Sequence, residues 1–155
     1  NMKKIIYSIL ILSIISCSSD DSENTSNYII WTGANIEFVK TANSDPNDEI
    51  NQDKITSSVS ITRGTSGGQI YNIFSENEYT KETSPLGTEW AIGNVSNISN
   101  LSFLPFRSAV ESPKQVVGKS LVLHIIEEDV YLSVKFKSWG ENQIGSFSYE
   151  RSTQN

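Results

Sequence analysis

Cysteine, histidine and basic residues are scarce in this chain of 155 residues. It contains one cysteine and one histidine, and 12 Lys and Arg residues stand against 18 Asp and Glu residues. A single cysteine excludes an internal disulfide, so the fold depends on packing alone. One cysteine and one histidine do not supply an ordinary zinc site. The net charge of −6 argues against nucleic acid as a partner, because phosphate binding requires a basic face.

A hydrophobic run long enough to span a membrane is absent from the N-terminal region. The apolar segment Ile5–Ile15 has 11 residues, whereas a transmembrane helix needs about 20. It follows Lys3 and Lys4 and precedes a small residue, which is typical of a secretory signal peptide. The residues Ile14-Ile15-Ser16-Cys17 resemble the lipobox of bacterial lipoproteins, which implies that Cys17 is diacylated and becomes the N-terminus. Cleavage by an ordinary signal peptidase is the alternative. In that case Cys17 has no evident role.

The residues after Cys17 indicate a location. Ser18-Ser19-Asp20-Asp21 resembles the short acidic signal of surface-exposed lipoproteins in Bacteroidota. That resemblance implies an outer-membrane lipoprotein exposed at the cell surface, with the membrane as a partner through Cys17. The alternative is a tether that is rich in Ser and Asp only because it must stay solvated. Each buried methylene of an acyl chain contributes ~0.8 kcal/mol, so an anchor of several chains is effectively permanent.

The sequence divides into three parts. Residues 1–16 are predicted to be the lipoprotein signal peptide, residues 17–27 the lipidated cysteine and a polar tether, and residues 28–155 a single β-sandwich domain. Removal of the signal peptide takes away two lysines and brings the net charge from −6 to about −8. An acidic surface of this kind favours solubility.

The pattern of the domain is that of β-strands. Apolar residues alternate with Tyr, Ser and Lys between positions 130 and 137, which predicts a strand with one buried and one wet face. Further strands are expected at 28–32, 35–41, 54–63, 69–74, 88–93, 121–126 and 145–151, with a short helix at 45–52 or 106–111. About eight strands separated by Gly, Asn and Pro predict an all-β fold, an antiparallel β-sandwich or jelly-roll-like domain.

A second resemblance rests on five segments, namely Ile61–Gly64, Thr88–Ala91, Leu123–Ile126, Val134–Trp139 and Gly145–Ser152. Together they look like an all-β domain that is common in uncharacterised secreted and surface proteins of bacteria. The likeness covers most of residues 30–152. No biochemical activity is attached to that domain, so the resemblance implies a fold and a setting but no reaction.

Aromatic side chains provide the candidate ligand site. By the alternation of the predicted strand, Tyr131 and Trp139 lie on the same wet face as Lys135 and Lys137. Exposed aromatic rings stack on sugars, and contiguous exposed patches are seldom without function. The two lysines would pair with carboxylated sugars. The alternative is that these aromatic rings belong to the core, as is usual for aromatic residues in strands.

Two other features have structural interpretations. His124 alternates with Leu123 and Ile125 in an apolar strand, and we expect a hydrogen-bonded structural residue rather than a base or a metal ligand.

The segment Gly64–Gly68 resembles the nucleophile loop of trypsin-like proteases, with Ser66 in the position of the nucleophile. However, His124 follows Ser66, which is the wrong order for that family. A glycine-rich hairpin turn is therefore the expected structure.

Two arginines, Arg63 and Arg151, end predicted strands. Glu89 and Glu150 are candidate carboxylate partners elsewhere in the chain. A buried arginine–glutamate pair of this kind would be structural.

An acidic loop offers oxygen ligands for calcium, which takes six to eight of them. Asp45, Asn47, Glu49 and Asp53 alternate with other residues in this loop. The EF-hand pattern fails, because Ile50 stands where the turn glycine belongs. These four residues are therefore weak calcium candidates, and no cofactor or metal is expected.

From these features we expect a lipid-anchored, non-catalytic binding or adhesion module whose ligand is a glycan or a surface protein. One alternative is a glycan-active enzyme, which would need two carboxylates about 5–10 Å apart in a cleft. Another is a structural accessory subunit of a surface complex, which would present a flat apolar patch. No residue of the sequence is assigned a catalytic role.

Replacing Cys17 by alanine tests the predicted anchor. The Cys17→Ala precursor should stay uncut by the lipoprotein signal peptidase and should take up no acyl label, because the thiol that is acylated is missing. Metabolic labelling and membrane fractionation measure both properties. Normal maturation and membrane retention of the variant would remove the lipoprotein interpretation. Replacing Asp20 and Asp21 by alanine should keep the lipid but reduce protease accessibility on intact cells.

Overall fold

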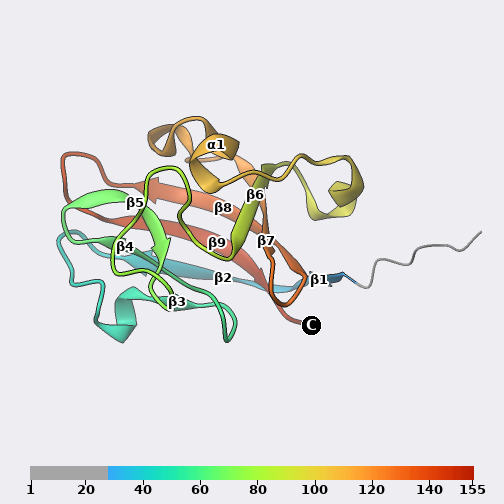
Figure 1. Cartoon of the computed structure of the whole chain (residues 1–155), viewed down its shortest axis with the longest axis horizontal. Helices are drawn as coiled ribbons and strands as arrows, with labels where there is room; N and C mark the ends of the chain where they lie inside the picture. Colours follow the sequence, from blue (N-terminus) through green and yellow to red (C-terminus); the bar gives the residue numbers. More distant parts are fainter. Residues whose placement is uncertain (1–27) are drawn as a thin grey trace, which may run out of the picture.

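Two β-sheets face each other in the computed structural model, which describes residues 28–155 (Figure 1). The larger sheet has the strand order β2-β9-β8-β7-β6, and β1 pairs with the first residues of β8. Its strands are β1 (Ile29–Trp31), β2 (Gly33–Lys40), β6 (Thr88–Ile92), β7 (Ser120–Ile125), β8 (Val130–Trp139) and β9 (Phe147–Thr153). The all-β sandwich predicted from the sequence is confirmed, with the difference that β1 runs parallel to β8. Cys17, the predicted signal peptide and the tether lie outside the described residues.

The smaller sheet has the strand order β3-β4-β5. Its strands are β3 (Asp53–Lys54), β4 (Ser60–Gly64) and β5 (Gly67–Asn72), and the helical turns are η1 (Glu49–Asn51), η2 (Val95–Asn100), α1 (Phe106–Val110) and η3 (Pro113–Gln115). Both regions in which a short helix was expected hold one, whereas η2 and η3 were not expected. Among residues 28–155, no helix has the length and apolar character needed to cross a membrane.

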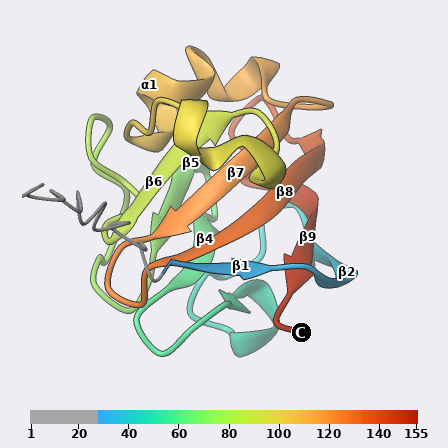
Figure 2. The same cartoon turned by 90° about the vertical axis from the view of Figure 1, so that its right-hand side faces the viewer.

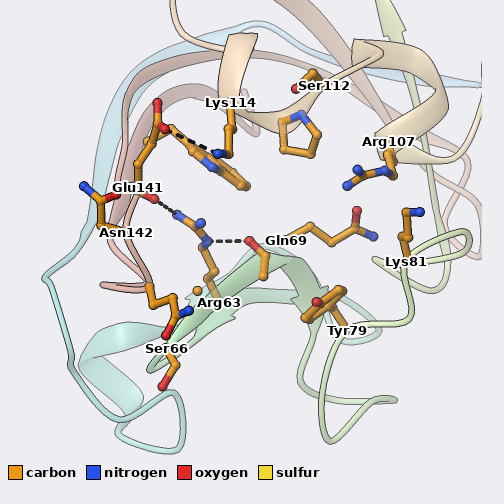
Figure 3. A pocket seen from close by; sticks show the side chains of 16 residues that line it. Arg63, Ser66, Gln69, Tyr79, Lys81, Arg107, Ser112, Lys114, Glu141 and Asn142 are labelled. Carbon is orange, nitrogen blue, oxygen red and sulfur yellow. Dashed lines mark hydrogen bonds and ion pairs between the residues drawn. The ribbon is translucent and has the colours of Figure 1, made fainter.

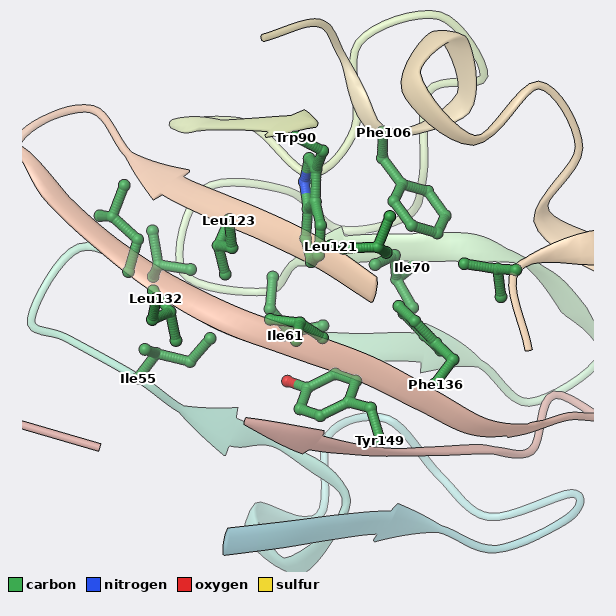
Figure 4. Close-up of a cluster of buried hydrophobic side chains, with 14 of the residues drawn as sticks. Ile55, Ile61, Ile70, Trp90, Phe106, Leu121, Leu123, Leu132, Phe136 and Tyr149 are labelled. Atoms are coloured by element: carbon green, nitrogen blue, oxygen red, sulfur yellow. The ribbon is translucent and has the colours of Figure 1, made fainter. Parts of the chain in front are cut away.

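The hydrophobic core lies between the two sheets and extends towards α1 (Figure 4). Val134 and Phe136 are buried, at 2% and 0% exposure, while Lys135 and Lys137 are exposed. The alternation predicted for this strand is therefore confirmed. The core side chains labelled in Figure 4 come from both sheets and from α1, and they include Ile61, Ile70, Trp90, Phe106, Leu121, Leu123 and Leu132.

The single strand predicted at 54–63 is wrong, because the chain turns back within it. The amide of Ile55 donates to the carbonyl of Val59 at 3.0 Å, so β3 and β4 form a hairpin. Ile55, Val59 and Ile61 are all buried, and their even spacing reflects burial on both sides of a turn. Ser57, the gap in the apolar pattern, is exposed at that turn.

Both ends of the described chain lie at the same end of the sandwich (Figures 1 and 2). The amide of Thr32 donates to Oδ1 of Asn155 at 2.8 Å, close to where β1 pairs with β8. The turns between β4 and β5 and between β8 and β9 lie at the opposite end, on the left of Figure 1. The chain therefore enters the fold at the end remote from these two turns.

A buried ion pair joins the two sheets. Arg151 of β9 donates from Nε to Oδ2 of Asp53 at 2.6 Å and from Nη2 to Oδ1 at 2.8 Å. The hydroxyl of Tyr149 donates to the same carboxylate at 2.6 Å. Burial raises the pKa of the Tyr149 phenol well above its ordinary value, and the nearby Asp53 carboxylate raises it further. Arg151 thus has a buried carboxylate partner, but that partner is Asp53, since Glu150 pairs with Lys137.

Asp53→Asn should destabilise the protein by about 3–5 kcal/mol, because it leaves the Arg151 charge buried without a counter-charge. Urea unfolding measures the loss. Glu150→Gln is the matched control, since it makes the same chemical change in the exposed pair with Lys137 and should leave stability almost unchanged. Equal effects of the two substitutions would contradict the role given to the buried pair.

Candidate functional site

A cavity of about 560 Å³ opens at the end of the sandwich remote from β1. Its size falls within the range of ~300–1,000 Å³ that is usual for small-ligand sites. Four segments line it, namely the β4–β5 hairpin, the β8–β9 hairpin, the loop around residues 79–81 and the stretch from α1 to η3 (Figure 3). Because these segments are far apart in the sequence, the cavity exists only in the folded chain.

Trp139 lines this cavity and does not lie on the outer wet face of β8. A β-bulge between Phe136 and Ser138 shifts the register with β9, so the side chains beyond it change faces. Trp139 therefore packs against the core, with its ring centre 5.8 Å from that of Phe136. The prediction that Trp139 shares a face with Lys135 and Lys137 is wrong for this reason.

Arg63 fastens the two hairpins together beside Trp139. Its guanidinium carbon lies 3.9 Å from the centre of the Trp139 ring. Nε donates to the carbonyl of Gly68 at 2.8 Å, and Nη1 donates to the carbonyls of Gly140 and Ser146 at 3.0 and 2.7 Å. Burial lowers the pKa of Arg63 to about 10, so it stays charged at neutral pH. Among the described residues no carboxylate pairs with this guanidinium, and its charge is available to the cavity.

Three further cations line the cavity, from the loop, from α1 and from η3, and they are Lys81, Arg107 and Lys114. Lys114 pairs with Glu141 at 3.4 Å and Lys81 with Glu82 at 3.7 Å, while Arg107 has no carboxylate partner in the described part of the chain. Of the described residues that line the cavity, Glu141 alone carries a carboxylate. The cavity is therefore positively charged, although residues 28–155 contain 10 basic and 15 acidic residues.

Gln69 contributes a buried hydrogen-bond acceptor. Its Nε2 donates to the carbonyls of Thr80 and Ser84, at 3.2 and 3.1 Å, which fixes the orientation of the amide because only the NH₂ group can donate. Its Oε1 has no hydrogen-bond partner within residues 28–155, and Figure 3 shows the side chain reaching towards Arg107 and Lys81. A buried acceptor without a partner costs ~1–3 kcal/mol, and because Gln69 is 1% exposed this oxygen lies behind the cavity surface.

Glycine lets the two hairpins approach each other. Gly145 has φ +63°, and a Cβ at this position would overlap the carbonyl oxygen of Gly64. Gly68 has φ +81°, and a Cβ there would overlap the ring of Tyr79, which therefore rests on the hairpin. The glycine-rich hairpin turn predicted at 64–68 is confirmed as the connection between β4 and β5.

The other members of the predicted ligand site are not gathered around the cavity. Lys135 and Lys137 are exposed on the outer face of the larger sheet. Tyr131 lies on the same face but eight positions before Trp139, which corresponds to about 26 Å along a strand. The structure therefore does not bring Tyr131 and Trp139 together as a stacking platform.

His124 is hydrogen-bonded, as expected for a structural residue. Its ring stacks on Tyr131 with centres 4.1 Å apart, and its Nε2 lies 3.0 Å from Oδ1 of Asp129. Glu89 lies 3.7 Å from the other ring nitrogen. Ser66 instead lines the cavity at the β4–β5 turn, so the structure does not bring these two residues together as a serine–histidine pair.

The four calcium candidates have other partners. Asp53 belongs to the buried ion pair, and Glu49 pairs with Lys54 at 3.2 Å. Oδ1 of Asp45 accepts hydrogen bonds from the amide and the side chain of Asn47, each at 2.9 Å. Across residues 28–155, no three His, Cys, Asp or Glu side chains come together in a way that could hold a metal ion.

Known proteins offer no guide to this site, since no family model, curated protein or solved structure matches the chain. Of the positively charged residues that line the cavity, the sequence pointed to Arg63 alone, and it indicated a structural role for that residue. Lys81, Arg107, Lys114 and Gln69 were missed. They come from separate segments and share no spacing, so the sequence carries no local signal that links them.

Trp139→Ala should lower the free energy of unfolding by about 3 kcal/mol, because the ring packs against core residues and supports Arg63. Thermal or urea unfolding measures the change. Lys135→Ala, on the outer face of the same strand, should leave the unfolding midpoint almost unchanged. If Trp139→Ala proved as stable as the wild type, the inward orientation of the ring would be contradicted.

Proposed function

We propose that this protein is a non-catalytic binding module that takes an acidic saccharide in the cavity, while a lipid on Cys17 holds it on the outer membrane at the cell surface. The observation that carries the proposal is the concentration of four cations around one cavity of an acidic domain. A hollow with charges of one sign focuses their field and raises the local concentration of an oppositely charged ligand.

The polar groups of the cavity fit a carboxylated sugar. Arg107 and Lys81 lie on the same side of the cavity, towards which Gln69 extends, and together they form an anion-binding pair (Figure 3). A uronic acid carries on one ring a carboxylate for these cations and hydroxyl groups that can hydrogen-bond to the polar lining. Tyr79 is 40% exposed and offers a ring face for stacking on the sugar.

The position of the cavity suits a domain anchored through the residues that precede it. Residue 28 enters the fold next to β1, and the cavity lies at the opposite end. An anchor at Cys17 would therefore leave the cavity facing away from the membrane, where a saccharide outside the cell can reach it.

The same lining favours binding over hydrolysis. A glycoside hydrolase of the common type uses two carboxylates that flank the scissile bond. Among the described residues lining the cavity, Glu141 supplies the one carboxylate, and it is paired with Lys114. The cavity therefore lacks the pair of groups that the alternative of a glycan-active enzyme requires.

Calorimetric titration with glucuronate and its oligosaccharides tests the proposal. The wild type should bind, and its affinity should fall as salt is added, because the attraction is electrostatic. The double substitution Lys81→Gln/Arg107→Gln should weaken binding at least tenfold, since a hydrogen bond to a charged group contributes ~1.5–3 kcal/mol.

Lys135→Gln/Lys137→Gln is the matched control, because it removes the same charge from the outer face of β8. This variant should bind like the wild type. A loss of binding in the control and not in the cavity variant would move the site to the outer face that the sequence suggested. No binding of any acidic saccharide by the wild type would refute the proposal.

A further inference from the structure

A second cavity, of about 370 Å³, adjoins the first. The two cavities share four lining residues, Ser66, Gly67, Gly68 and Tyr79. Three of these belong to the β4–β5 turn, where the two glycines carry no side chain, and the ring of Tyr79 rests on Gly68. The Tyr79 ring and the β4–β5 turn therefore border both cavities, and a ligand that occupies both would cross them.

The two cavities differ in charge. The first is lined by four cations and Glu141, whereas the charged residue lining the second, within the described chain, is Glu78. Tyr71 lies in the second cavity, and burial together with the neighbouring carboxylates Asp45, Glu76 and Glu78 raises the pKa of its phenol. A negative charge is thus favoured in the first cavity and disfavoured in the second.

The lining of the second cavity suits a neutral sugar. Pro46 and Tyr79 offer apolar surface above the buried Tyr71, and Asn77 and Glu78 offer hydrogen-bonding groups. Apolar faces with a few polar groups are the usual composition of a carbohydrate-sized ligand site. Glu78 and Asn77 are exposed and can accept or donate hydrogen bonds to sugar hydroxyls.

We propose that the two cavities form one groove with two subsites, which binds a saccharide in which an acidic sugar is followed by a neutral one. The acidic unit occupies the subsite of Arg63, Lys81 and Arg107, and the neutral unit occupies the subsite of Tyr71 and Glu78. This inference rests on the proposed function of the first cavity and adds to it the length and the charge pattern of the ligand.

Four probes test the two subsites, each titrated into the full protein. They are glucuronate, the two disaccharides that join glucuronate to a neutral N-acetylhexosamine in either order, and diglucuronate. One of the mixed disaccharides should bind at least fivefold more tightly than glucuronate. Diglucuronate should bind no more tightly than glucuronate, because its second carboxylate would face Glu78.

A charge reversal in the second cavity completes the test. Glu78→Lys should raise the affinity for diglucuronate at least fivefold and leave that for glucuronate unchanged. Glu127→Lys, which makes the same charge change on the exposed turn between β7 and β8, should alter neither affinity.

The outcomes separate the inference from the proposed function. If glucuronate binds but the disaccharides bind no more tightly, or if Glu78→Lys changes nothing, the two-subsite groove is refuted and the first cavity stands. If no saccharide binds, the proposed function fails and the groove fails with it. Binding of an oligoglutamate peptide in place of every saccharide would also overturn both, because it would identify a different class of ligand.

Discussion

The buried contact between Asp53 and Arg151 is the interaction on which the two-sheet arrangement depends. The smaller sheet has three short strands, and Cys17 is the sole cysteine of the chain, so no disulfide can attach that sheet to the larger one. Asp53 and Arg151 are 98 positions apart, and with Tyr149 they fix where β3 lies against β9. Either charge alone would be buried at a cost of several kcal/mol, so the two sheets keep one relative position.

Arg63 also has a buried guanidinium, but no carboxylate among the described residues neutralises its charge. It is bound by the carbonyls of Gly68, Gly140 and Ser146, which satisfy its donors but do not cancel its charge. The bond from Nε stays within the β4–β5 hairpin, and the two bonds from Nη1 cross to the β8–β9 hairpin. The contacts that hold the two hairpins together therefore leave a positive field at the cavity. Because the hairpins are already fixed, a ligand need not order them when it binds, and this lowers the entropic cost of association.

The sequence predicts local features well and long-range ones poorly. Alternation from Val130 to Phe136 depends on neighbouring residues, and the strand and its buried face followed from it. The bulge after Phe136 depends on the pairing with β9, so the orientation of Trp139 could not be read from the same pattern. The partner of Arg151 was sought in Glu89 or Glu150, while the true partner, Asp53, belongs to β3 and lies 98 positions away, where no local pattern links it to β9. The cavity has the same origin, since its charges meet only after four segments have folded.

The parallel pairing of β1 with β8 has a mechanical consequence. β8 runs from Val130, beside β1, to Trp139 in the cavity, about 30 Å in all. A pull on the proposed ligand at one end, resisted by the proposed anchor at Cys17, would pass through the pairing of β1 with β8 and along this strand. The hydrogen bonds that join β8 to β7 and β9 would then be loaded along the strand axis, where many must break together instead of one after another. A central strand whose hydrogen bonds are loaded in shear resists force far better than an edge strand whose hydrogen bonds can break one at a time.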